Sequence, residues 1–380
     1  MTTDRRALPR LSRIAGAVGL VALAAAIVGG WFAPDAFFQA WLIAWLFVLG
    51  IALASMMCAM IHELTGGEWG VVLRPPLEAA MLTLPWCALL AVPLAFGLPH
   101  LFPWARPEAI AGNEVLRSQQ WFLNAPSFLV RNAAWLLVWS ALAVTFARRI
   151  ALRGPGDPPA RRIAVAGLLI YLVTVTLFAY DWLVSLVPGW SSTAAGVRLG
   201  AAQFLAAFAF AVVFLVAVPD RRSAGAPPTA RDFQDFGNLL LTFAMFWAYI
   251  AYMQFFIIWG EDLPRETSWY VPRLETSWRA LALAVLALDF ALPFVAMLFR
   301  DVKRNRLALA SVCALVLLGQ WLDVVWLTAP SWRPDGFALH WLDVAASIAI
   351  GAVWLAVAAA IAARLPVRGA PRRQEASAHG

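Results

Sequence analysis

The chain has few charged residues. Only 13% of its 380 residues are Asp, Glu, Lys or Arg, whereas a soluble globular chain carries about 25%. Hydrophobic residues make up 62% of the chain, and 20 Trp and 24 Phe are among the bulky side chains. This balance excludes an ordinary soluble domain and indicates a polytopic membrane protein, in which lipid surrounds the folded helices.

Lysine is almost absent. Lys303 is the only one, so arginine carries nearly all of the positive charge behind the net charge of +7. A basic chain can bind nucleic acid through such charges. The arginines here gather between apolar runs, where membrane topology accounts for them. We therefore expect no nucleic-acid partner.

Cysteine and histidine are scarce as well. The three cysteines lie in apolar runs and form no Cys-x-x-Cys pair, which argues against iron–sulfur clusters and covalently attached haem. The four histidines stand at a helix end, in loops or in the tail, so no two are placed to ligate a haem inside a bundle. We expect no haem, no iron–sulfur cluster and no metal in this chain. The residues concerned are Cys58, Cys87, Cys313, His62, His100, His340 and His379.

Ten apolar runs are each long enough to cross a bilayer, which takes about 20 residues in a helix. The first resembles a signal peptide, but it is long enough to span and no clear cleavage site follows it, so we expect it to be retained. The runs are 14–32, 37–61, 77–98, 124–147, 163–187, 197–218, 236–259, 278–299, 306–328 and 341–363. They predict an all-α membrane domain over 1–366, followed by a disordered polar tail at 367–380.

The basic residues predict the orientation. With the N-terminus in the cytoplasm, 21 of the 29 basic residues fall in cytoplasmic segments and seven on the opposite side, while Arg131 lies within a span. Loops rich in Arg and Lys stay in the cytoplasm. Both termini are therefore predicted to be cytoplasmic. In the third run, Pro75 and Pro76 are expected to begin the helix, because proline fits a first turn.

Asp181 is the most informative single residue. It stands near the end of the fifth run, beside Trp182 and a group of Ser and Thr residues typical of a membrane–water boundary. A bare carboxylate inside hydrocarbon costs several kcal/mol, so it persists with a partner, a proton or a function. Two interpretations stay open for Asp181: a proton- or quinone-handling group, or one half of a structural pair with an arginine.

Several sequence motifs resemble one known family. They are Asp181-Trp-Leu-Val-Ser-Leu, Gln254-Phe-Phe-Ile-Ile-Trp, His62-Glu-Leu-Thr-Gly-Gly and His340-Trp-Leu-Asp, with the stretch around 300–327. The chain is similar to the second of the two large quinol-type membrane subunits of bacterial alternative complex III, which are related to the NrfD/polysulfide reductase membrane subunits. One departure is Val187-Pro-Gly, where the family usually has Glu-Pro.

The resemblance implies the fold, the location and the partners. It implies two four-helix bundles, helices two to five and six to nine, flanked by helices one and ten, in the bacterial inner membrane. It also implies a respiratory quinol:cytochrome c oxidoreductase, in which a homologous quinol-binding membrane subunit, a multi-haem c-type cytochrome and an iron–sulfur subunit are separate chains. This subunit would then hold no redox cofactor itself, and would act as a scaffold and a proton path.

The remaining polar groups sort by depth, counted at about 1.5 Å per helical residue. Arg131, Asp181, Gln254 and Asp323 all fall in the periplasmic third, and Trp182 is adjacent to Asp181. Such a set could bind a quinol head, accepting its proton and donating to its oxygen. An ion pair between Arg131 and an aspartate is the structural alternative. We predict Arg131, Asp181, Trp182 and Gln254 as quinone-side groups.

A proton path also needs acids at other depths. Asp289 lies near the midplane, and with Asp181 and Asp323 it forms our predicted relay; the structural alternative is a protonated Asp bonded to a carbonyl. His62 and Glu78, at the cytoplasmic ends of the second and third runs, are predicted to admit protons, with solvated charges as the alternative.

Two other classes of function remain open. A secondary transporter would show helices interrupted by Gly or Pro at matching positions of two halves, and the prolines here are less regular than that. An assembly or anchor protein would tolerate the loss of every buried carboxylate.

Overall fold

The computed structural model describes residues 7–152, 160–218 and 227–365, and in these ranges it holds ten helical segments long and apolar enough to cross a membrane. The predicted tail at 367–380 lies outside the described residues. The spans are α1 (Ala7–Phe32), α2 (Pro34–Thr65), α3–α5 (Glu68–Phe96), α9 (Ala125–Ala151), α10 with η2 (Arg161–Leu186), α11 (Ala195–Ala217), α12 (Ala230–Glu261), α15–α16 (Trp278–Leu298), α18 with η5 (Arg306–Ser331) and α19 (Trp341–Ala362).

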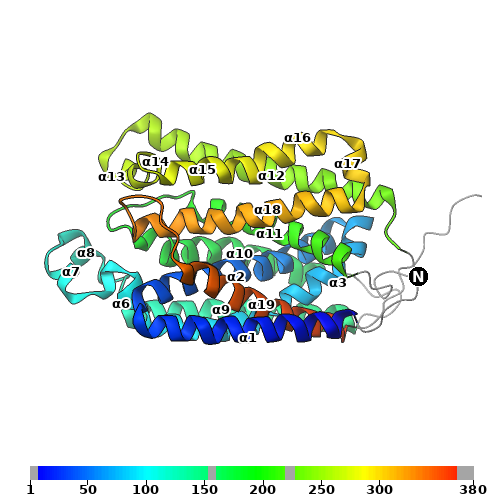
Figure 1. The fold of residues 1–380 in the computed structure, drawn as a ribbon, viewed down its shortest axis with the longest axis horizontal. Helices are drawn as coiled ribbons and strands as arrows, with labels where there is room; N and C mark the ends of the chain where they lie inside the picture. Colours follow the sequence, from blue (N-terminus) through cyan, green and yellow to red (C-terminus); the bar gives the residue numbers. More distant parts are fainter. Residues whose placement is uncertain (1–6, 153–159, 219–226, 366–380) are drawn as a thin grey trace, which may run out of the picture.

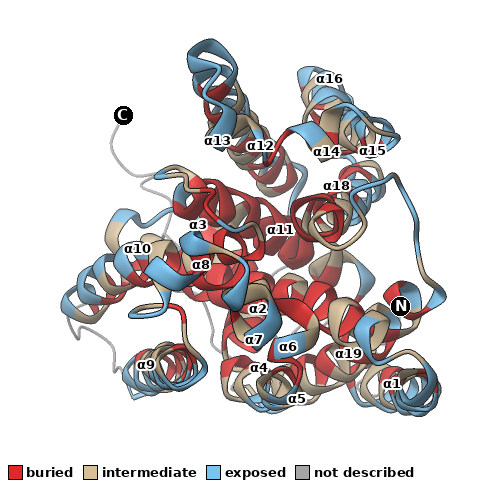
Figure 2. Ribbon diagram, turned by 90° about the vertical axis from the view of Figure 1, so that its left-hand side faces the viewer, coloured by how far each residue is buried: buried red, intermediate tan, exposed pale blue. Residues whose placement is uncertain are grey.

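Helices α2 and α11 form the centre. In their apolar stretches 94% and 78% of the residues are buried inside the protein, and Figure 2 shows both surrounded by the other helices. Their sequences are apolar on all sides, as expected of helices with no face toward solvent. The long faces of the other spans carry exposed apolar side chains, which suit lipid.

The predicted arrangement of two bundles is confirmed. The first bundle consists of α2, α3–α5, α9 and α10, and the second of α11, α12, α15–α16 and α18. Helices α1 and α19, the first and last spans, pack on each other and on α2 at one side of the molecule (Figure 2). The bundles meet where α2 packs on α11.

The third and eighth spans are interrupted. The third consists of α3 (Glu68–Met81), α4 (Leu84–Leu90) and α5 (Val92–Phe96), with Pro85 and Pro93 in the first turns of α4 and α5. The prediction that Pro75 and Pro76 begin the helix was wrong, because α3 already starts at Glu68. In the eighth span a π-helical turn, η4 (Ala287–Ala291), separates α15 (Trp278–Leu286) from α16 (Leu292–Leu298).

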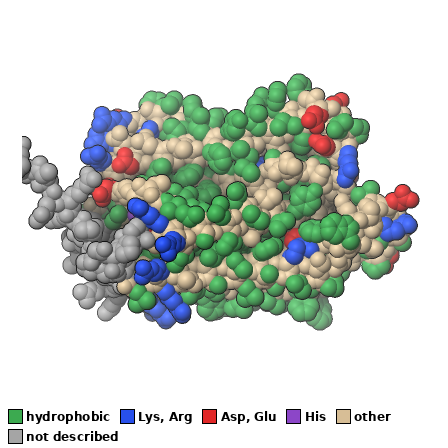
Figure 3. Space-filling view, turned by 180° about the vertical axis from the view of Figure 1, so that it is seen from behind, with side chains coloured by type: hydrophobic (Ala, Val, Ile, Leu, Met, Phe, Trp, Pro, Cys, Tyr) green, Lys and Arg blue, Asp and Glu red, His purple; other side chains and the backbone are tan. Residues whose placement is uncertain are grey.

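Short elements cover the end of the molecule opposite the N-terminus, called the distal end below (Figure 1). They are α6 (Leu98–Leu101), η1 (Pro103–Ala105), α7 (Pro107–Ala111), α8 (Glu114–Gln119), α13 (Pro264–Thr267) and α14 (Val271–Leu274); α17 (Arg300–Arg304) lies at the other end. Figure 3 shows charged side chains gathered toward the two ends and a mostly hydrophobic surface between them, as a protein embedded in a bilayer requires.

The close packing of α1 on α19 depends on a glycine. A Cβ added at Gly19 would lie 2.8 Å from both Cγ2 and the backbone nitrogen of Val353, whereas one at Gly16 would lie 3.8 Å from Cβ of Ala356. The Ser12 hydroxyl also donates to the Ala356 carbonyl at 2.9 Å. Small residues allow this approach of helix backbones, which stabilises helix pairs in lipid.

Gly19→Ala is therefore expected to destabilise the protein by about 1–3 kcal/mol, the usual cost of overpacking. Thermal unfolding of the purified protein in detergent, followed by tryptophan fluorescence, measures this. Gly16→Ala is the matched control and should be neutral or slightly stabilising, because alanine favours the helix. Equal stability of the two variants would contradict the packing argument.

Candidate functional site

A buried ion pair occupies the distal part of the first bundle. Asp181, fully buried near the end of α10, accepts hydrogen bonds from Nη2 and Nε of Arg131 at 2.6 and 3.2 Å. Asn132, one residue further along α9, donates from Nδ2 to the same carboxylate at 2.9 Å. Three donors compensate the buried negative charge, as a carboxylate away from water requires. The predicted ion pair between Arg131 and an aspartate is confirmed.

Aromatic rings enclose this pair. Trp182 donates from Nε1 to Oδ1 of Asn132 at 2.5 Å, and its ring packs on Trp45 at a centroid distance of 4.8 Å and on Phe128 at 5.0 Å. The Arg131 guanidinium lies 3.8 Å from the centroid of the Phe122 ring. The cluster is therefore tightly packed, and its polar atoms are engaged with one another.

A second ion pair lies in the second bundle. Arg198, in the first turn of α11, donates from Nη1 and Nη2 to the two carboxylate oxygens of Asp323 on α18 at 2.9 and 2.7 Å. Both side chains are buried. A bidentate pair of this kind is the strongest geometry available to arginine and carboxylate. The rings of Trp247 and Trp326 lie 5.6 and 5.9 Å from the guanidinium carbon.

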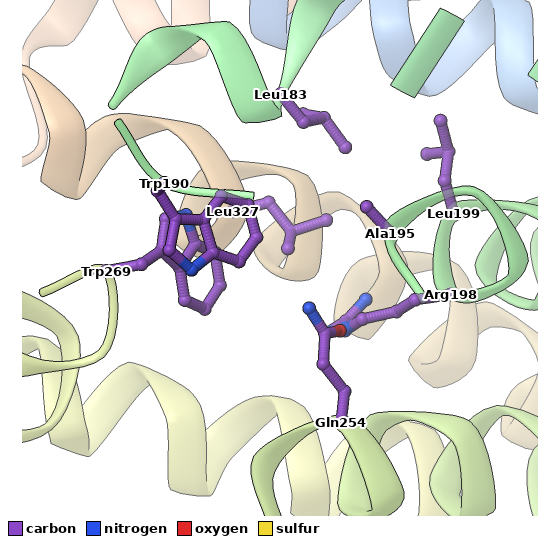
Figure 4. A pocket seen from close by; sticks show the side chains of 8 residues that line it. All are labelled: Leu183, Trp190, Ala195, Arg198, Leu199, Gln254, Trp269 and Leu327. Carbon is purple, nitrogen blue, oxygen red and sulfur yellow. The ribbon is translucent and has the colours of Figure 1, made fainter. Parts of the chain in front are cut away.

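Gln254 lies beside the same arginine. Its side chain extends from α12 toward the Arg198 guanidinium (Figure 4). Its amide nitrogen donates to the Ser192 hydroxyl at 3.1 Å, while its buried oxygen has no hydrogen-bond partner among the described residues. Together with Trp190 and Trp269, whose rings stack at 4.9 Å, these groups line a cavity of about 10 Å³. That volume is about the size of one water molecule, and Arg198 and Gln254 are the polar groups in an otherwise apolar lining.

A much larger pocket opens on the other side of Arg198. It has a volume of about 420 Å³ and lies between α12, α15 and α18, with Arg198 and Asp323 among its lining residues. Aromatic side chains form much of its wall, and the exposed side chains of Tyr252, Leu283 and Leu286 lie at its opening. Its size falls in the range of small-molecule sites in proteins.

Asp289 is a further buried acid of the second bundle. It lies in the π-helical turn η4, and neither carboxyl oxygen has a hydrogen-bond partner in the described part of the chain. A Cβ added at Gly319 of α18 would lie 2.3 Å from Oδ1 of Asp289, so the carboxyl rests against that helix. The Gln320 amide faces it without completing a hydrogen bond. Gly319 and Asp323 are four residues apart, so they lie on one face of α18.

The distal loop between α12 and α15 completes the surroundings of Arg198. Arg273, fully buried on α14, donates to the carbonyls of Trp326 and Leu327 at 3.2 and 2.8 Å, and so satisfies the end of α18. The loop that Arg273 anchors in this way places Tyr270 in the wall of the large pocket. Burial raises the pKa of Tyr270 to about 12. Its hydroxyl therefore stays protonated at neutral pH and can donate a hydrogen bond.

The predicted site residues separate into two groups. Asp289 and Asp323 come together in the second bundle, and Gln254 adjoins them through Arg198. Arg131, Asp181 and Trp182 form the separate cluster of the first bundle. The predicted relay and the predicted quinone-side set are therefore each divided between the two bundles.

The two predicted proton-entry residues lie at the end of the molecule that holds the N-terminus. His62 contacts the Gly67 carbonyl through Nε2 at 3.0 Å, and its ring meets Trp69 edge-on. Next to it, Arg74 donates to Glu63 at 2.7 Å. Glu78 is buried one turn after Arg74 on α3. A role in proton entry stays a prediction for His62 and Glu78.

Three important residues were missed by sequence reasoning: Asn132, Arg198 and Arg273. In the sequence, Arg198 and Arg273 contributed only to the number of basic residues on each side of the membrane, from which the orientation was predicted. A signal was nevertheless present, because Asp181 and Asp323 each precede a proline by seven residues and a tryptophan by nine. Each motif also ends its helix in a short 3₁₀ turn, η2 (Val184–Leu186) or η5 (Ala329–Ser331). Comparing the chain with itself would have identified Asp323 as the counterpart of Asp181.

Within the described ranges no group of three His, Cys, Asp or Glu side chains is placed to hold a metal ion. No model of a known protein family matches the chain, and no curated protein matches it either. The resemblance to the quinol-type membrane subunits therefore remains a hypothesis.

Arg131→Ala is expected to destabilise the protein by about 3–5 kcal/mol, because it leaves the Asp181 carboxylate buried without its cation. Unfolding in detergent, followed by tryptophan fluorescence, measures the loss. Arg117→Ala, at an exposed arginine of α8, should change stability by no more than about 0.5 kcal/mol.

A double variant, Arg131→Met with Asp181→Leu, should recover most of that stability, since both charges are then absent. If Arg131→Ala alone unfolds like the unsubstituted protein, the pair does not stabilise the first bundle.

Proposed function

We propose that this chain is an integral membrane subunit of a quinol:electron-acceptor oxidoreductase of the alternative complex III type, acting as a scaffold and as a proton path. Its partners would be a homologous quinol-binding membrane subunit, a multi-haem c-type cytochrome and an iron–sulfur subunit. Support comes from the motifs quoted above, from ten membrane-crossing segments and from ionisable groups buried in the second bundle.

The observation that carries the proposal is the proximity of two buried acids, Asp289 on η4 and Asp323 on the facing helix α18. Asp289 has no hydrogen-bond partner in the described residues, while Asp323 is held by Arg198. Ionisable groups in membrane helices are costly and are usually retained for function. A carboxyl group that is not committed to a structural bond can accept a proton at one oxygen and release it again, which is what a relay requires.

The π-helical turn at Asp289 supports the same interpretation. Such a turn widens the helix by one residue and is found frequently at functional sites. Here it presents the carboxyl to Gly319, the one residue type on α18 that leaves room for it. From Asp289 the line of polar groups continues past Gln320 to Asp323 and Arg198, and then to the cavity beside Gln254.

The assembly proposal is tested by purification from native membranes. A tagged chain extracted in mild detergent should bring down a c-type cytochrome, visible in its haem spectrum, and an iron–sulfur subunit identified by mass spectrometry. A colourless protein without partners would overturn it. Uptake assays would then test the secondary-transporter alternative.

Asp289→Asn is expected to lower quinol-dependent turnover at least about tenfold, because the amide cannot relay a proton, a role typically worth 10²–10⁴-fold. Its unfolding temperature should stay close to that of the unsubstituted protein, since neither carboxyl oxygen has a close hydrogen-bond partner among the described residues. Turnover and unfolding of the purified complex are measured together. Asp301→Asn, at an exposed acid of α17, is the control.

Asp323→Asn should behave differently. It removes the charge that compensates Arg198, so it should lower both turnover and stability, the latter by about 3–5 kcal/mol. Full turnover in Asp289→Asn with normal assembly would exclude the relay, and insensitivity of every buried carboxylate to substitution would favour an anchor protein.

A further inference from the structure

The large pocket of the second bundle has the features of a binding site for a lipid-soluble ligand. We propose that it binds the ring of a quinone-class molecule, with the ring oxygens directed toward Arg198 and Tyr270 and the tail directed into the bilayer. This deepens the proposed function and rests on it. It also moves the quinone site away from Arg131, Asp181 and Trp182. Of the four quinone-side groups predicted from sequence, Gln254 is the one that lies beside Arg198.

The walls of the pocket match a flat ring. Trp247, Phe255 and Trp326 line it, with Ala248, Ala251 and Ala282 leaving space between them. Aromatic side chains favour stacked or edge-on contacts with another ring. The volume of about 420 Å³ holds a substituted ring and the start of a tail.

Hydrogen-bond donors gather at the polar side of the pocket. Arg198 uses Nη1 and Nη2 for Asp323, and a guanidinium carries five N–H groups, so others are left to donate. Tyr270 contributes a hydroxyl that is protonated at neutral pH, as that of any tyrosine is, and burial raises its pKa further. Arg279, exposed on α15, adds a further cation to the lining. These groups suit a carbonyl oxygen, which accepts hydrogen bonds and carries no proton.

The opening of the pocket faces lipid. Tyr252 on α12 and Leu283 and Leu286 on α15 are exposed, and both helices belong to membrane-crossing segments. A ligand can therefore enter from the bilayer and leave an apolar tail among the lipid chains. The Arg131–Asp181 cluster offers no comparable arrangement, because its donors are used on Asp181 and its surroundings are packed rings.

An anionic phospholipid head fits this site less well. Asp323 already neutralises Arg198 through two hydrogen bonds, and its carboxylate would repel a phosphate brought to the same place. A neutral ring with carbonyl oxygens meets no such repulsion. The charge arrangement thus favours a quinone over a phospholipid.

The test is photolabelling of the detergent-purified complex with an azido-quinone, followed by mass spectrometry of the labelled peptides. We expect labels within 247–255 and 279–286, removed by excess unlabelled quinone and unaffected by excess phosphatidylglycerol. Ala251→Phe places a bulky ring in the pocket while leaving Arg198 and Asp323 in the sequence, and should lower labelling at least fivefold. Ala134→Phe, at an exposed alanine of α9 at similar depth, should leave it unchanged.

Four results would each overturn the proposal. They are labels on α9 or α10, labelling that persists in Ala251→Phe, competition by phosphatidylglycerol, and no labelling. If Ala251→Phe does not fold, the label map of the unsubstituted protein decides alone. The same sample reports the partner subunits separately through its haem spectrum. A labelled pocket without partners would contradict the assembly and leave the binding site standing, whereas partners without a labelled pocket would do the reverse.

Discussion

The ion pair between Arg198 and Asp323 is the interaction on which the second bundle depends. Helices in lipid gain little from burying apolar side chains against each other, so specific polar contacts and close packing hold them together. Here a bidentate pair joins α11, at the centre of the molecule, to α18 across 125 residues of sequence. Neither charge could remain buried alone, since an uncompensated ion in such surroundings costs several kcal/mol. The first bundle uses Arg131 and Asp181 in the same way.

The two bundles are also tied to each other at the distal end by exchanged tryptophans. Trp190, which follows the Asp181 motif, stacks on Trp269 of the second bundle at 4.9 Å. Trp332, in the equivalent position after Asp323, donates from Nε1 to the Leu101 carbonyl of α6 at 2.9 Å. In each of the segments 181–190 and 323–332, the aspartate therefore pairs within its own bundle, while the tryptophan contacts the other bundle. This exchange fixes the loop that brings Ser192 to Gln254.

Much of the architecture could be predicted from the sequence, because the lengths of the apolar runs determine the spans and the positions of the arginines determine their orientation. The depth count also placed Arg131 at the level of Asp181, and their ion pair followed. Arg198 could not be found in the same way. An arginine in the first turn of a membrane helix is expected to lie at the membrane surface, until its partner in another helix is known. The π-helical turn at Asp289 depends on a shift of backbone hydrogen bonds that the local residue pattern does not predict.

The Arg131–Asp181 and Arg198–Asp323 pairs have the same chemistry in different surroundings, and we propose a function only for the second. Around Asp181 the donors are used and aromatic rings fill the space. In the described part of the chain, the buried carboxyl and amide atoms without a hydrogen-bond partner belong to Asp289, Gln320 and Gln254, all in the second bundle. Native proteins leave few such groups unpaired, and each costs stability. These three side chains lie around the Arg198–Asp323 pair, which is where the proposed relay would complete their bonds with a proton.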